Sequence, residues 1–206
     1  MNLPKQTFFN LPEEKREKIL QEVMTEFRDN AYDLASINRI VERSGISKGS
    51  FYQYFEDKED VYFYLLQIIG DKKLQYLGPT ISRIMDIGFY EALRKIYEAG
   101  IEFALEHPDY LTIGNRMMRD GGTMVRKLQE KFGGQSDALF SMLLEKGIER
   151  GEIRPDIEVP LVARLLMNMQ MTVVEYFFEK HQEVGYSKEI LSELNVFIEM
   201  VEKGIS

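Results

Sequence analysis

Residues 36–62 read SINRIVERSGISKGSFYQYFEDKEDVY, and this stretch predicts two short helices joined by a tight turn. We expect the helices over residues 36–44 and 47–55, because Gly45 can end the first helix and a serine can cap the second. Two helices of this length with so short a connection have the dimensions of a helix-turn-helix. In that motif the second helix lies in the major groove of DNA.

The apolar residues of this stretch predict how the two helices pack. Ile46, Phe51 and Phe55 can point back toward Ile40 and Val41 and form a small core with them. The opposite face of the second helix is then left for solvent or for a partner.

That opposite face is rich in groups that suit DNA. It carries Lys48, Ser50, Gln53 and Tyr54, with Tyr52 beside them. The hydroxyl groups of Ser and Tyr can bind phosphate oxygens, and Gln can bind a base edge. The spacing alone leaves a second interpretation open, in which the segment is an ordinary helical corner whose Tyr and Phe side chains form core.

A glycine and the local charge agree with a DNA-facing surface. Gly49 lies inside the second helix, where glycine costs about 1 kcal/mol relative to Ala, but it lets the backbone approach another surface closely. Across the two helices the ionised side chains are Arg39, Arg43 and Lys48 against Glu42. The whole chain has 26 basic and 34 acidic residues and a net charge of −8, so the positive field is confined to this segment.

The bulk composition excludes several classes of protein. The chain has 206 residues, enough for one sizeable core or for one core and a small satellite. It contains no run of 18 apolar residues and no secretion signal, so we expect a cytoplasmic protein that does not enter a membrane. The absence of cysteine excludes disulfides, thiolate metal sites and a cysteine nucleophile.

The motifs of enzymes are also missing from the sequence. The two histidines, His107 and His181, do not form a His-Glu-x-x-His pair. Neither a Gly-x-Ser-x-Gly elbow nor a phosphate-binding loop ending in Gly-Lys-Ser/Thr is present. We therefore expect no catalysis, no cofactor and no metal.

Helical periodicity continues through the remainder of the chain, and no run alternates in the manner of a strand. We predict an all-α fold of about nine helices. An N-terminal three-helix domain with the helix-turn-helix is expected over 1–57, and a helical ligand-binding and dimerisation domain over 58–206. The helices expected outside the motif cover 12–28, 58–77 or 58–85, 89–106, a segment ending near 118, 123–150 with a break at 133–134, 161–180 and 187–203. Residues 119–122 and 151–160 are expected to be loops.

At residues 36–62 the sequence resembles the tetracycline-repressor (TetR) family of bacterial transcription regulators. The resemblance lies in the Ser36-Ile37 start, the Gly45-Ile46-Ser47 turn, the run SKGSFYQYF and the lysine that opens the next helix. With the first helix and the residues leading into the motif, it covers about a quarter of the chain. The rest matches only in being all helical, with a GEIRPDI connector before two closing helices.

The resemblance implies a set of DNA-binding residues in the motif and at the start of the following helix. They are Ser36, Asn38, Ser47, Lys48, Gly49, Ser50, Tyr52, Gln53, Tyr54 and Lys58. Ser36, Tyr52 and Lys58 would bind the DNA backbone. Residues 47–50 would line the entry of the recognition helix, and Gln53 would face base edges. Asn38 falls where some members place a base-reading side chain. Members often carry His where this chain has Tyr54, whose hydroxyl can still form a hydrogen bond with a phosphate.

The segment LVARLLMNMQMTVVEYFF, residues 161–178, is apolar on more than one face and must be covered on two sides. One stripe can pack on its own domain and the other on a second copy, and the resemblance implies a homodimer through a four-helix bundle. The predicted interface residues are Val162, Leu166, Met169, Val173, Phe177, Leu194, Phe197, Ile198 and Val201. Two-fold symmetry would place the two reading helices roughly 34–36 Å apart, one turn of DNA. The alternative, in which both stripes pack within one chain, stays open.

The second half of the chain is also rich in Met and aromatic residues. Most of these fit a core, but Met tolerates varied partners and a subset could line a pocket for an apolar or aromatic small molecule. The candidate effector-binding residues are Tyr97, Phe103, Tyr110, Asn115, Met118, Phe140, Met167, Met171 and Glu175.

The leading hypothesis is a ligand-responsive transcriptional regulator, in the form of a repressor. It would bind a double-stranded DNA operator as a homodimer and be released by a small molecule held in the C-terminal domain. The alternative is a helical protein-binding adaptor whose short helices grip a peptide without binding DNA. Replacement of Tyr52 or Lys48 by Ala should weaken DNA affinity only under the first hypothesis.

Overall fold

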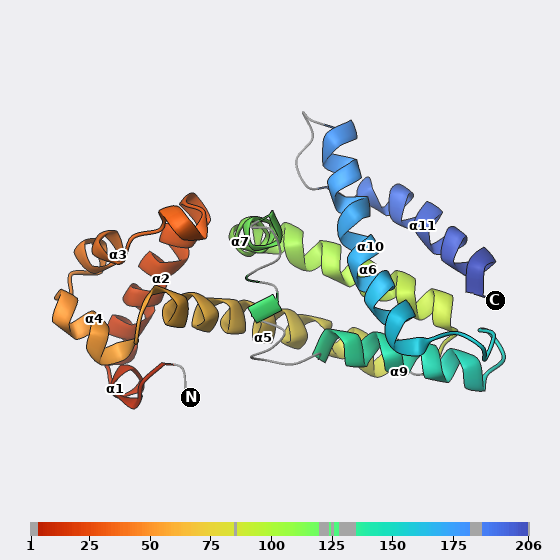
Figure 1. Ribbon diagram of the computed structural model, residues 1–206, viewed down its shortest axis with the longest axis horizontal. Coiled ribbons are helices and arrows are strands. Elements are labelled where there is room, and N and C mark those ends of the chain that lie inside the picture. Colours follow the sequence, from red (N-terminus) through yellow and green to blue (C-terminus); the bar gives the residue numbers. More distant parts are fainter. Residues whose placement is uncertain are drawn as a thin grey trace. The chain divides into compact units, whose positions relative to one another are not determined.

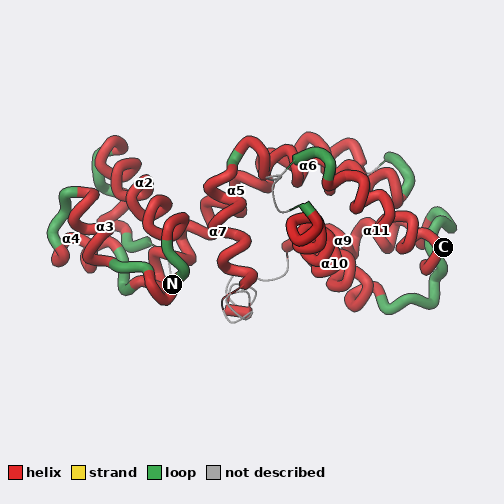
Figure 2. The backbone as a smooth tube through the Cα atoms, turned by 90° about the horizontal axis from the view of Figure 1, so that it is seen from above, coloured by secondary structure: helices red, strands yellow, loops and turns green. Residues whose placement is uncertain are grey.

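The computed structural model describes residues 4–84, 86–119, 124, 126–127, 135–181 and 187–205. Within these ranges every regular element is a helix, and they form ten α-helices and one short 3₁₀ helix (Figures 1 and 2). The predicted all-α fold is therefore confirmed. None of the described helices is long and apolar enough to cross a membrane.

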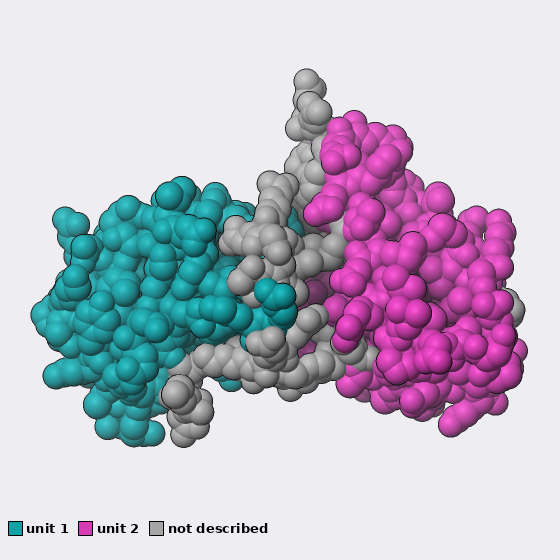
Figure 3. Space-filling view, in the orientation of Figure 1, with its two compact units in different colours: residues 1–72, 107–131 teal, residues 73–106, 132–206 magenta. Residues whose placement is uncertain are grey.

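The first compact unit comprises residues 1–72 and 107–131 (teal in Figure 3). Its elements are α1 (Gln6–Phe9), α2 (Glu13–Asp29), the 3₁₀ helix η1 (Tyr32–Leu34), α3 (Ile37–Ser44), α4 (Lys48–Tyr54), the first part of α5 (Lys58–Ile84) and α7 (Pro108–Arg119). Helix α2 packs on α3 and α7, while α4 packs on α3 and α1. Ile40, Phe51 and Phe55 are fully buried, which confirms the small core predicted for the helix-turn-helix.

The second compact unit comprises residues 73–106 and 132–206 (magenta in Figure 3). It contains the end of α5 together with α6 (Phe89–Glu106), α9 (Gln135–Glu149), α10 (Val159–Lys180) and α11 (Ile190–Ile205). Helix α10 packs on α9 and α11, and α6 packs on the same two helices. One continuous apolar cluster, which includes Tyr97, Phe140, Phe177 and Phe197, fills the space between them.

Most helices begin and end within a few residues of the predicted positions. Helix α5 continues past Pro79 to Ile84, so the longer of the two expected forms is present. Helix α1 was not predicted, because four residues are too few to display a helical period. The expected break at 133–134 and the loop at 119–122, apart from Arg119 at the end of α7, lie outside the described residues.

The border between the compact units falls inside α5, after Lys72. Helix α7 belongs to the first unit because it packs on α2. The two compact units are thus defined by which helices pack together. The predicted boundary at residue 57 separates a DNA-binding domain from a ligand-binding and dimerisation domain, and it stays a prediction.

Candidate nucleic-acid interface

One exposed surface runs over the start of α3 and along α4. Six of the ten predicted DNA-binding residues are exposed there, and we call them the recognition face: Asn38, Ser47, Lys48, Gly49, Tyr52 and Gln53. Ser36 and Ser50 are half-buried. Contact of these residues with DNA stays a prediction, but their side chains are available for it.

The turn before α4 is fixed by two local features. Gly45 has a φ of 68°, in the left-handed region that favours glycine, and the Ile46 N–H donates to the Val41 carbonyl at 3.2 Å to close α3. Ser47 then caps α4, because its Oγ accepts the Ser50 N–H at 3.0 Å. These bonds fix where α4, which carries most of the recognition face, begins.

Gly49 has no steric reason within the chain to be glycine. A Cβ added at this position would meet the Ser47 Oγ at 3.7 Å, which is ordinary van der Waals contact. The packing of the described residues therefore does not require glycine at this position of α4.

Tyr54 does not belong to the exposed surface. Its side chain is only 6% exposed, and its ring lies 6.0 Å from the ring of Phe8, centroid to centroid. Residues 51, 54 and 55 share the inner face of α4, so Tyr54 packs with the core residues rather than beside Gln53. The neighbouring Tyr52, in contrast, is 42% exposed.

A buried carboxylate anchors α3 on α2. Glu26 is fully buried and accepts hydrogen bonds from the Ser36 N–H at 2.9 Å, the Arg39 Nε at 3.0 Å, the Arg43 Nη2 at 2.7 Å and the Asn30 Nδ2 at 3.2 Å. Burial by itself would raise the pKa of the Glu26 carboxyl, but the hydrogen bonds and the charge of Arg39 outweigh it and lower the pKa below its ordinary value. The carboxylate is therefore charged at neutral pH and holds the start of α3 in place.

This network changes the charge expected on the helix-turn-helix. Arg43 also pairs with Glu22 through its Nε at 3.1 Å, so the two glutamates of α2 offset Arg39 and Arg43. Lys48 is the member of the recognition face that contributes positive charge.

Sequence reasoning missed Glu26, although a signal for it exists. The residue falls on the apolar stripe of α2, three positions after Val23 and directly before Phe27. A carboxylate at such a position must be paired when it is buried. Arg39 and Arg43, one helical turn apart on the next helix, are suitable partners.

Lys58 is engaged within the chain and not directed toward a partner. Its Nζ donates to the carbonyl oxygens of Tyr32 at 2.8 Å, Asp33 at 3.2 Å and Ala35 at 3.1 Å, and it lies 4.6 Å from the centre of the Tyr32 ring. An ammonium group has three donors, so these bonds use all of them. The structure assigns Lys58 to holding the loop before α3, whereas the family resemblance had implied a phosphate contact.

Three of the predicted effector residues lie in the packed interior of the second unit: Tyr97, Phe103 and Phe140. The Tyr97 ring lies 6.3 Å from the Phe140 ring, and its hydroxyl donates to the Leu166 carbonyl at 3.3 Å. Burial raises the pKa of the Tyr97 hydroxyl, which keeps it protonated. These contacts describe a satisfied core tyrosine.

The other predicted effector residues are distributed over both units. Tyr110 and Asn115 are half-buried on α7, Met167 is half-buried on α10, and Glu175 is exposed on the same helix. Two further members have side chains outside the described part of the structure: Met118 and Met171.

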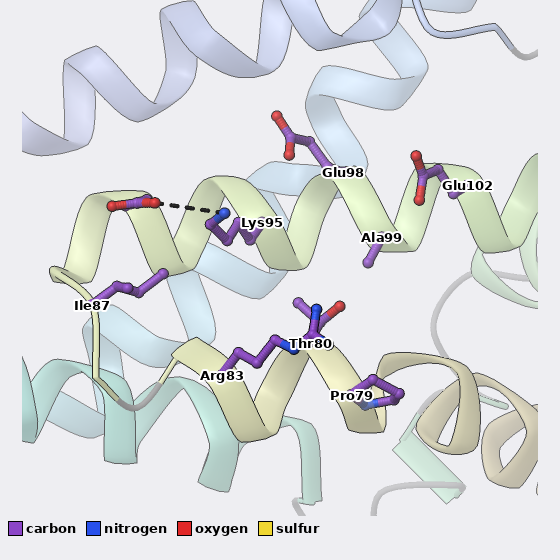
Figure 4. A pocket seen from close by; sticks show the side chains of 9 residues that line it. Pro79, Thr80, Arg83, Ile87, Lys95, Glu98, Ala99 and Glu102 are labelled. Carbon is purple, nitrogen blue, oxygen red and sulfur yellow. Dashed lines mark ion pairs between the residues drawn. The ribbon is translucent and has the colours of Figure 1, made fainter.

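A charged groove of about 330 Å³ lies between α5 and α6 in the second unit (Figure 4). It is lined by Pro79, Thr80, Arg83, Ile87, Glu91, Lys95, Glu98, Ala99 and Glu102. Lys95 pairs with Glu91 at 3.5 Å, one helical turn away. The lining contains none of the predicted effector residues and differs in character from the apolar pocket that we expected.

Helix α10 is apolar on two sides, but the predicted interface residues face inward. Six of them are buried in the subunit's own core: Leu166, Phe177, Leu194, Phe197, Ile198 and Val201. Val162, Met169 and Val173 are half-buried against that core. A different apolar set, which we call the outer stripe, is exposed on α10 and α11: Leu161, Leu165, Tyr176, Val196 and Met200.

An all-helical chain with a capped helix pair, an exposed polar face on the second helix of the pair and a separate helical unit defines a helix-turn-helix regulator. The family model for bacterial regulatory proteins of the tetR family matches residues 19–65. A TetR family transcriptional regulator from Chloroflexus aurantiacus is 32% identical in sequence, with 99% of each chain covered and a TM-score of 0.68. The chain belongs to the TetR family.

Other relatives extend this comparison. The HTH-type transcriptional regulator YfiR of Bacillus subtilis is 26% identical over 187 residues, covering 84% of this chain and 86% of the relative. The fatty acid metabolism regulator protein of Bacillus subtilis is 26% identical over 190 residues, covering 86% and 94%. The structure of the regulator FadR from Bacillus subtilis in complex with stearoyl-CoA shares the fold, with a TM-score of 0.72 at 18% identity over 92% of this chain and 99% of that one.

Proposed function

We propose that the protein is a transcriptional repressor that binds operator DNA in the cytoplasm as a homodimer and leaves it when a small molecule binds in the C-terminal domain. The observation that carries this proposal is the recognition face, six exposed residues on a helix pair whose own core is complete. Membership of a family of transcription regulators supports it. Residues 1–57 would carry DNA binding, and residues 58–206 would carry dimerisation and the effector site.

The recognition face divides into groups by chemistry. Gln53 and Asn38 carry amides that suit base edges, whereas Lys48 and the Tyr52 hydroxyl suit phosphate oxygens. Gly49 would let α4 approach the groove closely. We leave Lys58 and Tyr54 out of the direct contacts because both are engaged inside the first unit.

The experiment begins with duplexes enriched from a random-sequence library by the wild-type protein. For Gln53→Ala we expect roughly tenfold weaker binding of the enriched duplex, because one base contact is lost. For Lys48→Ala we expect weaker binding of all duplexes. The plot of the logarithm of the binding constant against the logarithm of the salt concentration should have a slope that is shallower by about one. Lys72→Ala, which removes a charge at an exposed position of α5, is the control and should bind as the wild type does. Failure of the wild type to enrich any duplex would overturn the proposal.

For the dimer we propose the outer stripe in place of the buried residues predicted from sequence. Its members are large apolar side chains exposed on the two C-terminal helices, and Val196 reaches 70% exposure. Contact with a second copy would cover this surface. Val196→Glu should raise the dimer dissociation constant at least roughly tenfold, since an unpaired carboxylate is costly to bury. Light scattering measures the mass, and Gln67→Glu, an exposed position of α5, should leave it unchanged.

For the effector we propose a fatty-acyl compound. A relative at 26% identity is named a fatty acid metabolism regulator, and a protein of the same fold was crystallised with stearoyl-CoA. Helix α5 is shared by both units and buries Tyr62 and Leu65, so it can pass a change from the second unit to the first. Addition of stearoyl-CoA should weaken the complex with the enriched duplex by roughly 5- to 150-fold, the usual range of such coupling. An unchanged affinity would contradict this choice of effector.

A further inference from the structure

The N-terminal segment, residues 4–11, packs against the end of α4 (Figure 1). Phe8 of this segment is fully buried. Its ring lies 5.0 Å from that of Phe55, 6.0 Å from that of Tyr54 and 5.8 Å from that of Tyr64, measured between centroids. The segment therefore covers the inner side of α4 at its C-terminal end.

Helix α4 cannot satisfy its own last carbonyl groups. The final bond within the helix runs from the Phe55 N–H to the Phe51 carbonyl at 2.9 Å. The next donor along the chain, the Glu56 N–H, is taken by the Asp60 carboxylate at 3.0 Å. The Tyr52 carbonyl and those after it consequently need donors from elsewhere.

The N-terminal segment supplies these donors. The Lys5 Nζ donates to the Tyr52 carbonyl at 2.9 Å, the Thr7 hydroxyl donates to the Gln53 carbonyl, and the Lys5 backbone N–H donates to the Tyr54 carbonyl at 2.9 Å. Three consecutive carbonyls are thus capped by residues that lie 46 to 49 positions earlier in the sequence. A glycine or asparagine at the helix end, the usual local solution, is absent here.

We infer that Lys5 and Thr7 are positioning residues for DNA reading. They hold the backbone of Tyr52 and Gln53, the two members of the recognition face in the last turn of α4. An ion pair between the Lys5 Nζ and the Glu56 Oε1 at 3.0 Å holds the same lysine from the other side. The inference rests on the proposed function, because it assigns the segment a role in sequence preference and not only in stability.

The experiment compares two duplexes, one enriched by the wild-type protein and one of random sequence. Thr7→Val keeps the shape of the side chain and removes only the hydroxyl donor. We expect binding of the enriched duplex to weaken roughly threefold, with less than a twofold change for the random duplex. Thr7→Ser restores the donor and should restore the preference. Thr112→Val is the matched control, because the Thr112 hydroxyl bonds within its own helix, to the Pro108 carbonyl at 3.0 Å.

Lys5→Met is the second variant and removes the donor to the Tyr52 carbonyl. We expect roughly tenfold weaker binding of the enriched duplex with an unchanged slope against salt, since Lys5 acts through α4. A uniform loss on both duplexes with a shallower salt slope would make Lys5 a phosphate contact and overturn the inference. A lower melting temperature with an unchanged preference would overturn it as well, because the segment would then be a structural cap only.

Hydrogen exchange of the DNA-free protein separates this inference from the proposed function. In Thr7→Val the amides of Phe55 and Tyr54 should exchange roughly threefold faster than in the wild type, because the end of α4 opens more often. Unchanged exchange would show that Thr7 does not hold the end of α4, whatever the DNA result. If the wild type enriches no duplex but exchange is faster in Thr7→Val, the proposed function fails. The stabilisation of the end of α4 by the N-terminal segment is then still supported.

Discussion

Each compact unit contains a buried apolar core, and the first unit also uses directional contacts beside its recognition face. In the first unit a buried carboxylate, Glu26, and an ammonium group, Lys58, fix the loop and helix that precede the recognition face. In the second unit one large apolar cluster around Tyr97 and Phe177 joins α6, α9, α10, α11 and the end of α5. Hydrogen bonds and ion pairs specify distance and direction, whereas apolar burial supplies free energy without direction. In the first unit the directional contacts thus lie next to the recognition face.

The largest effect is expected in the apolar cluster. Phe177 is fully buried on α10, and Phe177→Ala should lower the free energy of unfolding by about 3–5 kcal/mol. Chemical denaturation followed by circular dichroism measures this loss. Leu74→Ala, at an exposed position of α5, is the control and should cost less than about 1 kcal/mol. The folded Phe177→Ala protein should keep its preference among DNA duplexes, and a lost preference would contradict the contrast between the units.

A smaller loss with a different signature is expected for Glu26→Gln. Glutamine is uncharged and has one acceptor oxygen in place of two, so it cannot keep the ion pairs with Arg39 and Arg43. We expect a loss of about 3 kcal/mol, the lower end for a broken buried pair, because both arginines reach solvent. The variant should also bind the enriched duplex more weakly when folded, since α3 loses its anchor. Glu22→Gln, which removes only the outer partner of Arg43, should cost less than about 1 kcal/mol. Equal effects of the two substitutions would show that burial of Glu26 does not matter.

The dependence on pH tests the same carboxylate without a change in shape. The pKa of Glu26 is lowered in the folded protein from its ordinary value of 4.5, so its contribution is fully present above that value. As the pH falls through the lowered pKa, the carboxylate is protonated and the contribution is lost. The difference in unfolding free energy between the wild type and Glu26→Gln should therefore shrink below pH 4.5. The effects of the other carboxylates cancel in this difference, because both proteins contain them. A difference in unfolding free energy that stays constant down to pH 3 would contradict the charge assigned to Glu26.

The features that follow from neighbouring residues were predictable from the sequence. Gly45 and Ser47 mark the turn and the cap by their types alone, and the spacing of Phe51 and Phe55 places them inside. The partners of Lys58 were not predictable, because they are carbonyls that any residue type could provide. The packing of the N-terminal segment on α4 was not predictable either, because its contacts join residues more than 40 positions apart.

The second unit shows a further limit of sequence patterns. A helix that is apolar on two sides, such as α10, gives no sign of which side faces its own core. The structure places Leu166 inside and leaves Leu165 exposed, although the two residues are equally apolar. Likewise Tyr97 and Phe140 have the composition of a pocket wall, and only their burial identifies them as core.

The smallest effect on stability is expected at the recognition face itself, and it has the opposite sign. Gly49→Ala should stabilise the protein by up to about 1 kcal/mol, because alanine favours a helix and its Cβ would meet only the Ser47 Oγ at 3.7 Å. The same substitution should weaken binding of the enriched duplex at least roughly tenfold, because a methyl group would stand where the backbone approaches DNA. Gly70→Ala, at an exposed glycine inside α5 with nothing within 4 Å, should give a similar gain in stability and leave DNA binding unchanged. If Gly49→Ala bound DNA as tightly as Gly70→Ala, the glycine would have no role in close approach. A gain in stability that comes with a loss of binding would show that this position is selected for a partner and not for the fold.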